Sequence, residues 1–260
     1  MKYTSEDDFK WIVSDNGTVT ITGYNKDTDG VDLVIPATID GKRVESIGNS
    51  AFYMTKFQSV TLPEGLTTID NYAFSYCSMV QIDIPDSVTH IGMSAFSCCS
   101  RLTELKLPEG IDTISSSICY KCYNLRNVKI PKGVREIREF AFYDCVLCNL
   151  EIPDTVLKIG MFAFSNNNML ESLTLPNGLE SIEMGAFEQC PYLTSVTIPE
   201  GVRMIKGRAF EECESLTSVV LPETESLIYI GEHAFYGCPL LTKPKISGDV
   251  YVESTAMNEV

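Results

Sequence analysis

Proline recurs in this chain at a nearly fixed interval. Nine of the twelve prolines follow one another at steps of 22 or 23 residues: Pro63, Pro85, Pro108, Pro131, Pro153, Pro176, Pro199, Pro222 and Pro244. The residue before each of them is apolar except for Lys243, and the residue three positions before is apolar in every copy. This periodicity predicts a solenoid, because a single short repeat cannot bury its own apolar face and must stack on its neighbours.

The repeat reads L-x-x-V-x-I-P-x-G-V-x-x-I-x-x-x-A-F-x-x-C. Its V-x-I part alternates with period two and predicts a short strand with one buried face, which the proline ends. The A-F-x-x-C-x-x-L part has spacings of three and four, which predict a short α or 3-10 turn. Stacked copies of its phenylalanine would form an aromatic spine. Glycines two residues after the proline predict turns with positive φ; these are Gly65, Gly110, Gly133, Gly178 and Gly201.

The two ends of the chain depart from the repeat, as the end caps of a solenoid must. Residues 1–45 are interpreted as a strand-rich amino-terminal cap, with a hairpin turn at Asp15-Asn16-Gly17 and with Trp11 shielding the first repeat. Residues 31–36 resemble a repeat strand. Residues 46–244 are predicted to be the solenoid, and residues 245–260 a polar carboxy-terminal tail or cap.

The repeat resembles that of the BspA-like, treponemal-type leucine-rich repeat surface proteins. The resemblance is carried by Ile91-Gly92-Met93-Ser94-Ala95-Phe96 through Pro108, by Ile182 through Cys190, and by Ile205 through Cys213. It implies an α/β fold: a right-handed leucine-rich-repeat solenoid with short concave parallel strands and short helical or 3-10 turns on the convex side. It also implies a cell-surface or secreted protein of host-associated bacteria or protists that binds a host or bacterial protein.

The charge and the termini limit the functions that we expect. A net charge of −15 disfavours binding to nucleic acid or to anionic lipid, since both would be repelled. No apolar run approaches the ~18 residues that span a bilayer, so we expect no membrane insertion. The segment Met1 to Asp8 has no apolar stretch typical of a signal peptide, so a cytoplasmic location is the alternative to the surface. We expect a monomer.

Ten cysteines invite two interpretations. The pairs Cys119/Cys122 and Cys145/Cys148 lie in successive repeats, and their spacing resembles a four-thiolate metal or redox site. The repeat register offers another explanation. Cys122 and Cys145 belong to a column of buried thiols, and Cys119 stands where the other repeats carry the spine phenylalanine. The register therefore favours core packing and no cofactor, with the thiol site as the alternative.

The outward positions of the predicted strands hold the candidate binding residues. In the middle repeats these positions are charged or carry amides, and the most distinctive group is Asp83, Glu104, Lys106, Asn127, Lys129 and Glu151. The sequence holds no phosphate-binding loop, no nucleophile elbow and no zinc-protease motif, so we do not expect an enzyme. We predict a non-enzymatic protein-interaction or adhesion module that binds through the solenoid surface. A purely structural spacer of a larger protein is the other alternative.

Overall fold

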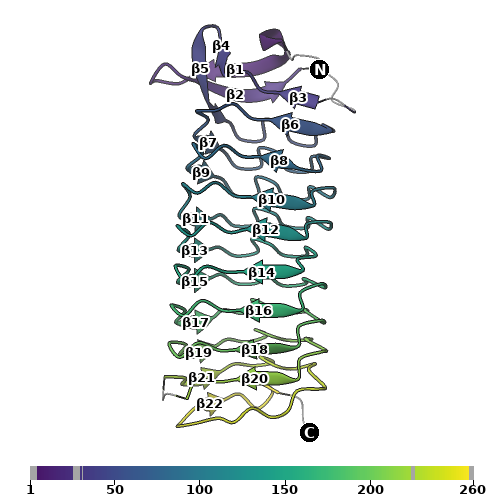
Figure 1. The fold of residues 1–260 in the computed structure, drawn as a ribbon, viewed down its shortest axis with the longest axis vertical. Helices are drawn as coiled ribbons and strands as arrows, with labels where there is room; N and C mark the ends of the chain where they lie inside the picture. Colours follow the sequence, from purple (N-terminus) through teal and green to yellow (C-terminus); the bar gives the residue numbers. More distant parts are fainter. Residues whose placement is uncertain (1–4, 26–29, 31, 224–225, 258–260) are drawn as a thin grey trace.

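The computed structural model describes residues 5–25, 30, 32–223 and 226–257. Its repeats stack into a column in which each repeat forms one rung (Figure 1). One side of the column, the long-strand face, carries β3 (Asp32–Val34), β6 (Ser59–Thr61), β8 (Ile82–Asp83), β10 (Glu104–Lys106), β12 (Asn127–Lys129), β14 (Asn149–Glu151), β16 (Ser172–Thr174), β18 (Ser195–Thr197) and β20 (Ser218–Val220). The predicted V-x-I strands are thereby confirmed.

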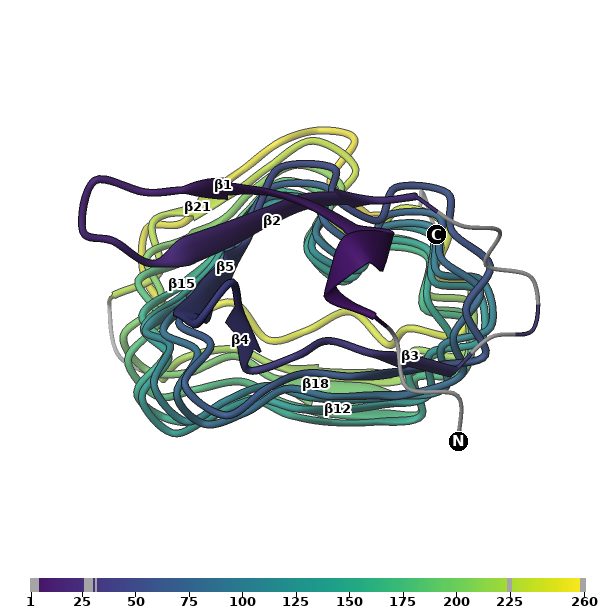
Figure 2. The same cartoon turned by 90° about the horizontal axis from the view of Figure 1, so that it is seen from above.

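A second side, the short-strand face, was not predicted from the sequence. It carries β5 (Lys42–Ile47), β7 (Thr68–Ile69), β9 (His90–Ile91), β11 (Thr113–Ile114), β13 (Glu136–Ile137), β15 (Lys158–Ile159), β17 (Ser181–Ile182), β19 (Met204–Ile205), β21 (Tyr229–Ile230) and β22 (Tyr251–Val252). Figure 2, a view down the column, shows the two strand faces and a remaining side that is formed by turns.

Parallel pairing holds the rungs in register. On the long-strand face Leu105 lies opposite Val128, and on the short-strand face Ile114 lies opposite Ile137. These four side chains are buried. Equivalent residues of successive repeats therefore form columns, and the column interior is one continuous hydrophobic core.

The A-F-x-x-C segment forms consecutive turns, which we call the turn face, and not the predicted helical turn. In the first copy, amides donate alternately within the rung and to the next rung: Ala51 N donates to Gly48 O at 3.2 Å, and Phe52 N donates to Ala73 O at 2.9 Å. A helix would direct all of these amides along its own axis. The alternation requires left-handed residues directly before the Ala and Cys positions, such as Tyr72 (φ 56°) and Tyr76 (φ 60°).

The prediction for the glycines after the prolines holds only in part. Gly65 has a φ of 87°, but Gly110, Gly133, Gly178 and Gly201 are not among the residues with positive φ. At Gly110 an added Cβ would lie 3.3 Å from the carbonyl oxygen of Val88, and at Gly201 it would lie 3.2 Å from that of Leu179. These two glycines lie where neighbouring rungs approach each other closely.

The aromatic spine is present. Successive phenylalanine rings stack nearly parallel, with centroids 5.2 Å apart for Phe52 and Phe74 and 5.5 Å apart for Phe210 and Phe235. The stack is interrupted at Cys119, which is fully buried. Parallel stacking follows from the repeat, since identical rotamers in successive rungs place the rings one above another.

Short elements outside the regular rungs lie at the amino-terminal end. The predicted hairpin is formed by β1 (Phe9–Val13) and β2 (Val19–Tyr24), and β2 pairs with β5. The 3-10 helix η1 (Glu6–Asp8) precedes it, and β4 (Thr38–Ile39) pairs with β5. Phe9 and Tyr24, 5.3 Å apart, cover the first rung together with the partly buried Trp11. Shielding of the first rung, which the sequence assigned to Trp11 alone, is thus shared by three aromatic side chains.

At the carboxy-terminal end, residues 251–257 form a partial rung. Strand β22 pairs with β21, Ala256 is buried, and Met257 pairs with Phe235. This segment continues the columns of the repeat and covers the last phenylalanine. The division at residues 45 and 245 stays a prediction.

Candidate functional site

The six predicted binding residues share one side of the molecule. Asp83, Glu104, Lys106, Asn127, Lys129 and Glu151 are all exposed, and they lie on β8, β10, β12 and β14. Lys106 lies opposite Asp83 on one neighbouring strand and opposite Lys129 on the other. The strand alternation turns their neighbours Leu105 and Val128 inward. We call this group the charged strand patch.

The charges of this patch are ordered along the column. Two neighbouring lysines, Lys106 and Lys129, are flanked by Asp83 and Glu151. Like charges directly opposite on a sheet destabilise it, so stability alone does not favour the lysine pair. The ammonium of Lys129 lies 3.4 Å from a carboxylate oxygen of Glu109, but both side chains are more than half exposed. An exposed pair of this kind contributes about 0–1 kcal/mol.

A hollow of about 370 Å³ adjoins the patch. Asp83 and Lys106 line it, together with Thr61, Glu64 and Asp86. The sequence identified the first two residues but not the hollow, because residues of three successive rungs line it together. The only sequence signal for Glu64 and Asp86 is the recurrence of an acidic residue directly after the turn proline.

The column thiols have a structural role that repeats from rung to rung. Each donates a hydrogen bond to the carbonyl oxygen of the spine residue in the preceding rung: Cys77 to Phe52 at 3.1 Å, Cys122 to Phe96 at 3.1 Å and Cys213 to Phe187 at 3.3 Å. Burial raises the pKa of Cys190 to about 12 and that of Cys238 to about 11. These thiols therefore stay protonated at neutral pH, as donors must.

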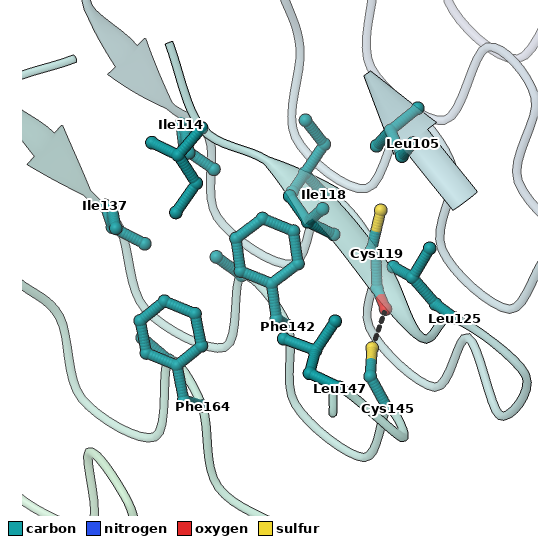
Figure 3. Packing of buried hydrophobic residues seen from close by; sticks show 14 of the residues in the cluster. Leu105, Ile114, Ile118, Cys119, Leu125, Ile137, Phe142, Cys145, Leu147 and Phe164 are labelled. Atoms are coloured by element: carbon teal, nitrogen blue, oxygen red, sulfur yellow. Dashed lines mark hydrogen bonds between the residues drawn. The ribbon is translucent and has the colours of Figure 1, made fainter. Parts of the chain in front are cut away.

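The two C-x-x-C pairs do not assemble into a four-thiolate centre. Cys145 donates to the carbonyl oxygen of Cys119 at 3.2 Å, and the sulfur of Cys119 points away from it (Figure 3). Cys119 and Cys145 are buried, and burial raises the pKa of both thiols. Cys148 is half-buried and donates weakly to Val146. Within the described ranges, no group of three or more His, Cys, Asp or Glu side chains is arranged to hold a metal ion.

The family model for the BspA-type leucine-rich repeat region matches residues 35–148 and 135–258, with six copies of the repeat. The chain belongs to this family. The resemblance noted in the sequence is thereby confirmed, and the repeating unit of the BspA-type solenoid is the rung described above. Leucine-rich repeats of this type generally form surface or interaction modules.

Solved structures of similar proteins show the same architecture. A leucine-rich repeat protein from Bacteroides ovatus is 27% identical, with a TM-score of 0.71 over 92% of this chain and 58% of its own. A leucine-rich cell surface protein from Faecalibacterium prausnitzii is 26% identical, with a TM-score of 0.58 over 99% and 86% of the two chains. The leucine-rich repeat protein of T. pallidum is 28% identical, with a TM-score of 0.50 over 93% and 91%.

This BspA-type chain thus spans little more than half of the Bacteroides ovatus structure. No curated protein matches it significantly. In the part of the chain that the structure describes, no helix has the length and apolarity needed to cross a bilayer.

Proposed function

We propose that this BspA-type solenoid is a non-enzymatic, surface-associated interaction module that binds a protein partner through the charged strand patch. The observation that carries the proposal is the exposed pair Lys106 and Lys129 on the paired strands β10 and β12, with Asp83 opposite Lys106 and Glu151 on the following strand of the same face, β14. Such an ordered set of charges gives specificity and orientation to a partner with complementary charges. The surface location is supported by the similar cell surface protein from Faecalibacterium prausnitzii.

The proposal is tested by locating a partner at the patch and then reversing the lysines. A photoreactive amino acid at Asn127 captures proteins from an extract of surface proteins, and saturable binding of each captured protein is measured with the unlabelled chain. We expect Lys106→Glu with Lys129→Glu to weaken binding by about tenfold or more, as loss of complementary charges does. The matched control is Lys132→Glu with Arg135→Glu, which makes the same change of charge at exposed positions outside the patch.

Both lysine substitutions are expected to leave the fold intact. The ion pair of Lys129 is exposed, so its loss costs less than about 1 kcal/mol. Urea denaturation of both double variants checks this. Unchanged binding in a folded Lys106→Glu/Lys129→Glu variant removes the charged strand patch as the binding site. If the control variant weakens partner binding equally, the effect of the Lys106→Glu/Lys129→Glu variant is one of net charge and not of the patch.

A further inference from the structure

The amino-terminal end of the column has an open strand edge that neither the repeat nor the proposed function explains. Strand β1 lies at the end of its sheet, and in the described part of the chain it pairs only with β2. It has five residues, whereas β3 and β20, which also lie at the ends of the column, have three each and β22 has two. Very short edge strands protect a sheet from pairing with another chain, and a longer apolar edge invites it.

Two apolar side chains of this edge are exposed. Ile12 is 56% exposed and Val13 is 46% exposed, although Phe9 at the start of the same strand is buried. Figure 2 shows the reason: the β1–β2 hairpin extends beyond the outline of the rungs, so its far end has no rung beneath it. Covering the first rung therefore does not account for the exposed pair.

The overhanging end of the hairpin is held in place by side-chain hydrogen bonds. Asn16 Nδ2 donates to a carboxylate oxygen of Glu45 at 2.9 Å, and the hydroxyl of Thr18 donates to the same oxygen at 2.8 Å. The side chain of Lys10 leans toward β2, since an added Cβ on Gly23 would lie 3.3 Å from its Cδ. The edge of β1 is thus anchored, and its lysine does not cover it.

The direction of the backbone groups along this edge follows from the hairpin. Ser14 N donates to Thr18 O at 2.8 Å, so Ser14 directs its backbone groups toward β2. Backbone groups of an antiparallel strand point alternately toward and away from the paired strand. Ile12 therefore bonds toward β2 as Ser14 does, whereas Trp11 and Val13 direct their N–H and C=O groups to the open edge.

We propose that two copies of this chain pair antiparallel along β1, related by a two-fold axis at Ile12. In this register Trp11 of one copy lies opposite Val13 of the other. The free N–H groups of each copy then donate to the free C=O groups of the other. An aromatic residue opposite a β-branched one is a favourable cross-strand pair, and the two Ile12 side chains meet at the axis. The edge matches itself in backbone bonding and in side chains, and this match selects a second copy as the occupant.

Charge and contact size set the strength of this dimer. Lys10 lies opposite Ser14 of the other copy, so no like charges lie directly opposite within the paired strands. Asp15 lies nearest to the start of β1 of the other copy, beside the exposed Glu6 and Asp7 of η1, and each chain carries −15. Because the contact is also short, we expect a weak, reversible dimer that strengthens as salt screens the repulsion.

A dimer of this kind presents two charged strand patches. Two linked sites bind a multivalent surface more tightly than one site does. The inference does not depend on the proposed function of that patch. It differs from the monomer expected from the sequence, and a measurement of molecular mass in solution decides between them.

Analytical ultracentrifugation of the full chain over a range of concentrations tests the proposal. We expect a monomer–dimer equilibrium that shifts toward the dimer at about 1 M sodium chloride, where the screening length falls to about 3 Å. Val13→Pro removes an N–H group at the open edge, a position where an edge strand tolerates proline. It should weaken the dimer by about tenfold or more, because each copy loses a hydrogen-bond donor to the other.

The matched control is Val252→Pro at the other end of the column. Tyr251 N and Glu253 N donate to β21, so Val252 directs its N–H to the open edge of β22. This variant should dimerise like the wild type. At high salt, Lys106→Glu with Lys129→Glu should also leave the dimer unchanged, so that the charged strand patch and the dimer can fail separately.

Cysteine substitutions test the register itself. At the two-fold axis the Ile12 residues form a non-hydrogen-bonded pair with Cα atoms about 4.5 Å apart, which is within the range of a disulfide. Ile12→Cys should therefore cross-link two copies faster than the wild type does under mild oxidation. Lys10→Cys is the control, because Lys10 lies opposite Ser14 and is about 14 Å from its own copy along the paired strands.

Several results would overturn the proposal. One is a monomer at every concentration in both salts, and another is a dimer that a folded Val13→Pro variant leaves unchanged, with folding checked by urea denaturation. Ile12→Asp is a second variant, since it places two carboxylates at the axis and should abolish the dimer. Equal weakening by Val252→Pro would show that β22 takes part in the contact, and Ile12→Cys that cross-links no faster than Lys10→Cys would reject the register.

A strand of a different protein is the rival occupant of this edge. A photoreactive amino acid at Ile12 distinguishes the two, because it should cross-link the chain to itself. If it captures another protein while the wild type stays monomeric, the assignment to a second copy is wrong.

Discussion

Two rungs depart from the repeat in different ways. In one, Ile118 and Cys119 replace the usual Ala-Phe pair, and both are fully buried. A larger residue at the first position accompanies a smaller one at the second, so the rung keeps much of its interior volume. In the other, Asn167 replaces the column thiol and is fully buried as well.

Asn167 keeps the donor and adds further bonds. Its amide nitrogen donates to Phe142 O and to Phe164 O, each at 2.9 Å, and its side-chain oxygen accepts from Leu147 N at 3.1 Å. The column thiols share the first bond, and Cys145, Cys190 and Cys238 add a long contact of 3.9–4.0 Å to the carbonyl oxygen two residues earlier. Each of these two interior columns therefore preserves a physical requirement, a volume or a hydrogen-bond donor, and not one residue type.

The largest expected effects concern the exchange of volume in the Ile118–Cys119 rung. Ile118→Ala alone leaves a cavity and should cost about 2–5 kcal/mol of unfolding free energy. Cys119→Phe alone overpacks the core and should cost about 1–3 kcal/mol. The double variant restores the Ala-Phe pair of the other rungs and should cost less than the sum of the two, because each change relieves the other. Urea denaturation of all four proteins measures the coupling.

An additive result, with the double variant as unstable as the sum of the single ones, would show that the two positions do not exchange volume. The matched control is the regular rung of Ala163 and Phe164. There, Ala163→Ile with Phe164→Cys introduces the irregular pair into an unbroken part of the stack. If the volumes of the Ile-Cys pair compensate each other, this double variant should also lose less unfolding free energy than the sum of its two single substitutions.

The Asn167 rung should show a smaller effect. Asn167→Ala leaves the buried Leu147 amide without its acceptor and Phe142 O without its side-chain donor, which together should cost about 1–3 kcal/mol. Asn167→Cys restores the donor to Phe142 but not the acceptor for Leu147. We expect its stability in urea to lie between those of the wild type and Asn167→Ala. A Cys variant no more stable than the Ala variant would contradict a donor requirement for the column.

The sequence predicted the repeat and the long strands because buried residues there alternate with period two, as at Leu105 and Leu107. It missed the short-strand face, where β11 and its equivalents are only two residues long and leave no alternation to detect. It also predicted helical turns where alternate amides bond to the next rung, because spacings of three and four fit both conformations. Local spacing does not distinguish bonding within a rung from bonding between rungs.

The candidate site also has parts that the sequence predicted and parts that it missed. The exposure of Lys106 and Lys129 follows from strand alternation, so the charged strand patch was predictable residue by residue. The hollow beside Asp83 was not predictable, since residues of neighbouring rungs line it together. The stack of Phe140 on Phe162 was missed because both residues occupy a variable position of the repeat. Both phenylalanines have a left-handed backbone, with φ of 55°, which the spacing of the repeat does not reveal.

The smallest expected effect distinguishes the thiol rungs from the asparagine rung by pH. Burial raises the pKa of Cys190 from 9.0 to about 12, whereas Asn167 has no proton to lose in this range. The folded state keeps the thiol proton after the unfolded state has released it. Unfolding is therefore favoured progressively as the pH rises above about 9, and the contribution is lost by about pH 12. Below pH 9 both states hold the proton, and this thiol adds no pH dependence.

Replacing one thiol by asparagine should remove one proton from this linkage. We expect the unfolding free energy of Cys190→Asn, measured in urea at intervals from pH 8 to pH 11, to fall less steeply above about pH 9 than that of the wild type, by the equivalent of about one proton. Cys148→Asn is the control, since that thiol is half-buried and outside the column. Parallel pH profiles for Cys190→Asn and the wild type would mean that Cys190 ionises alike in both states, and the donor role of the column thiols would lose its support.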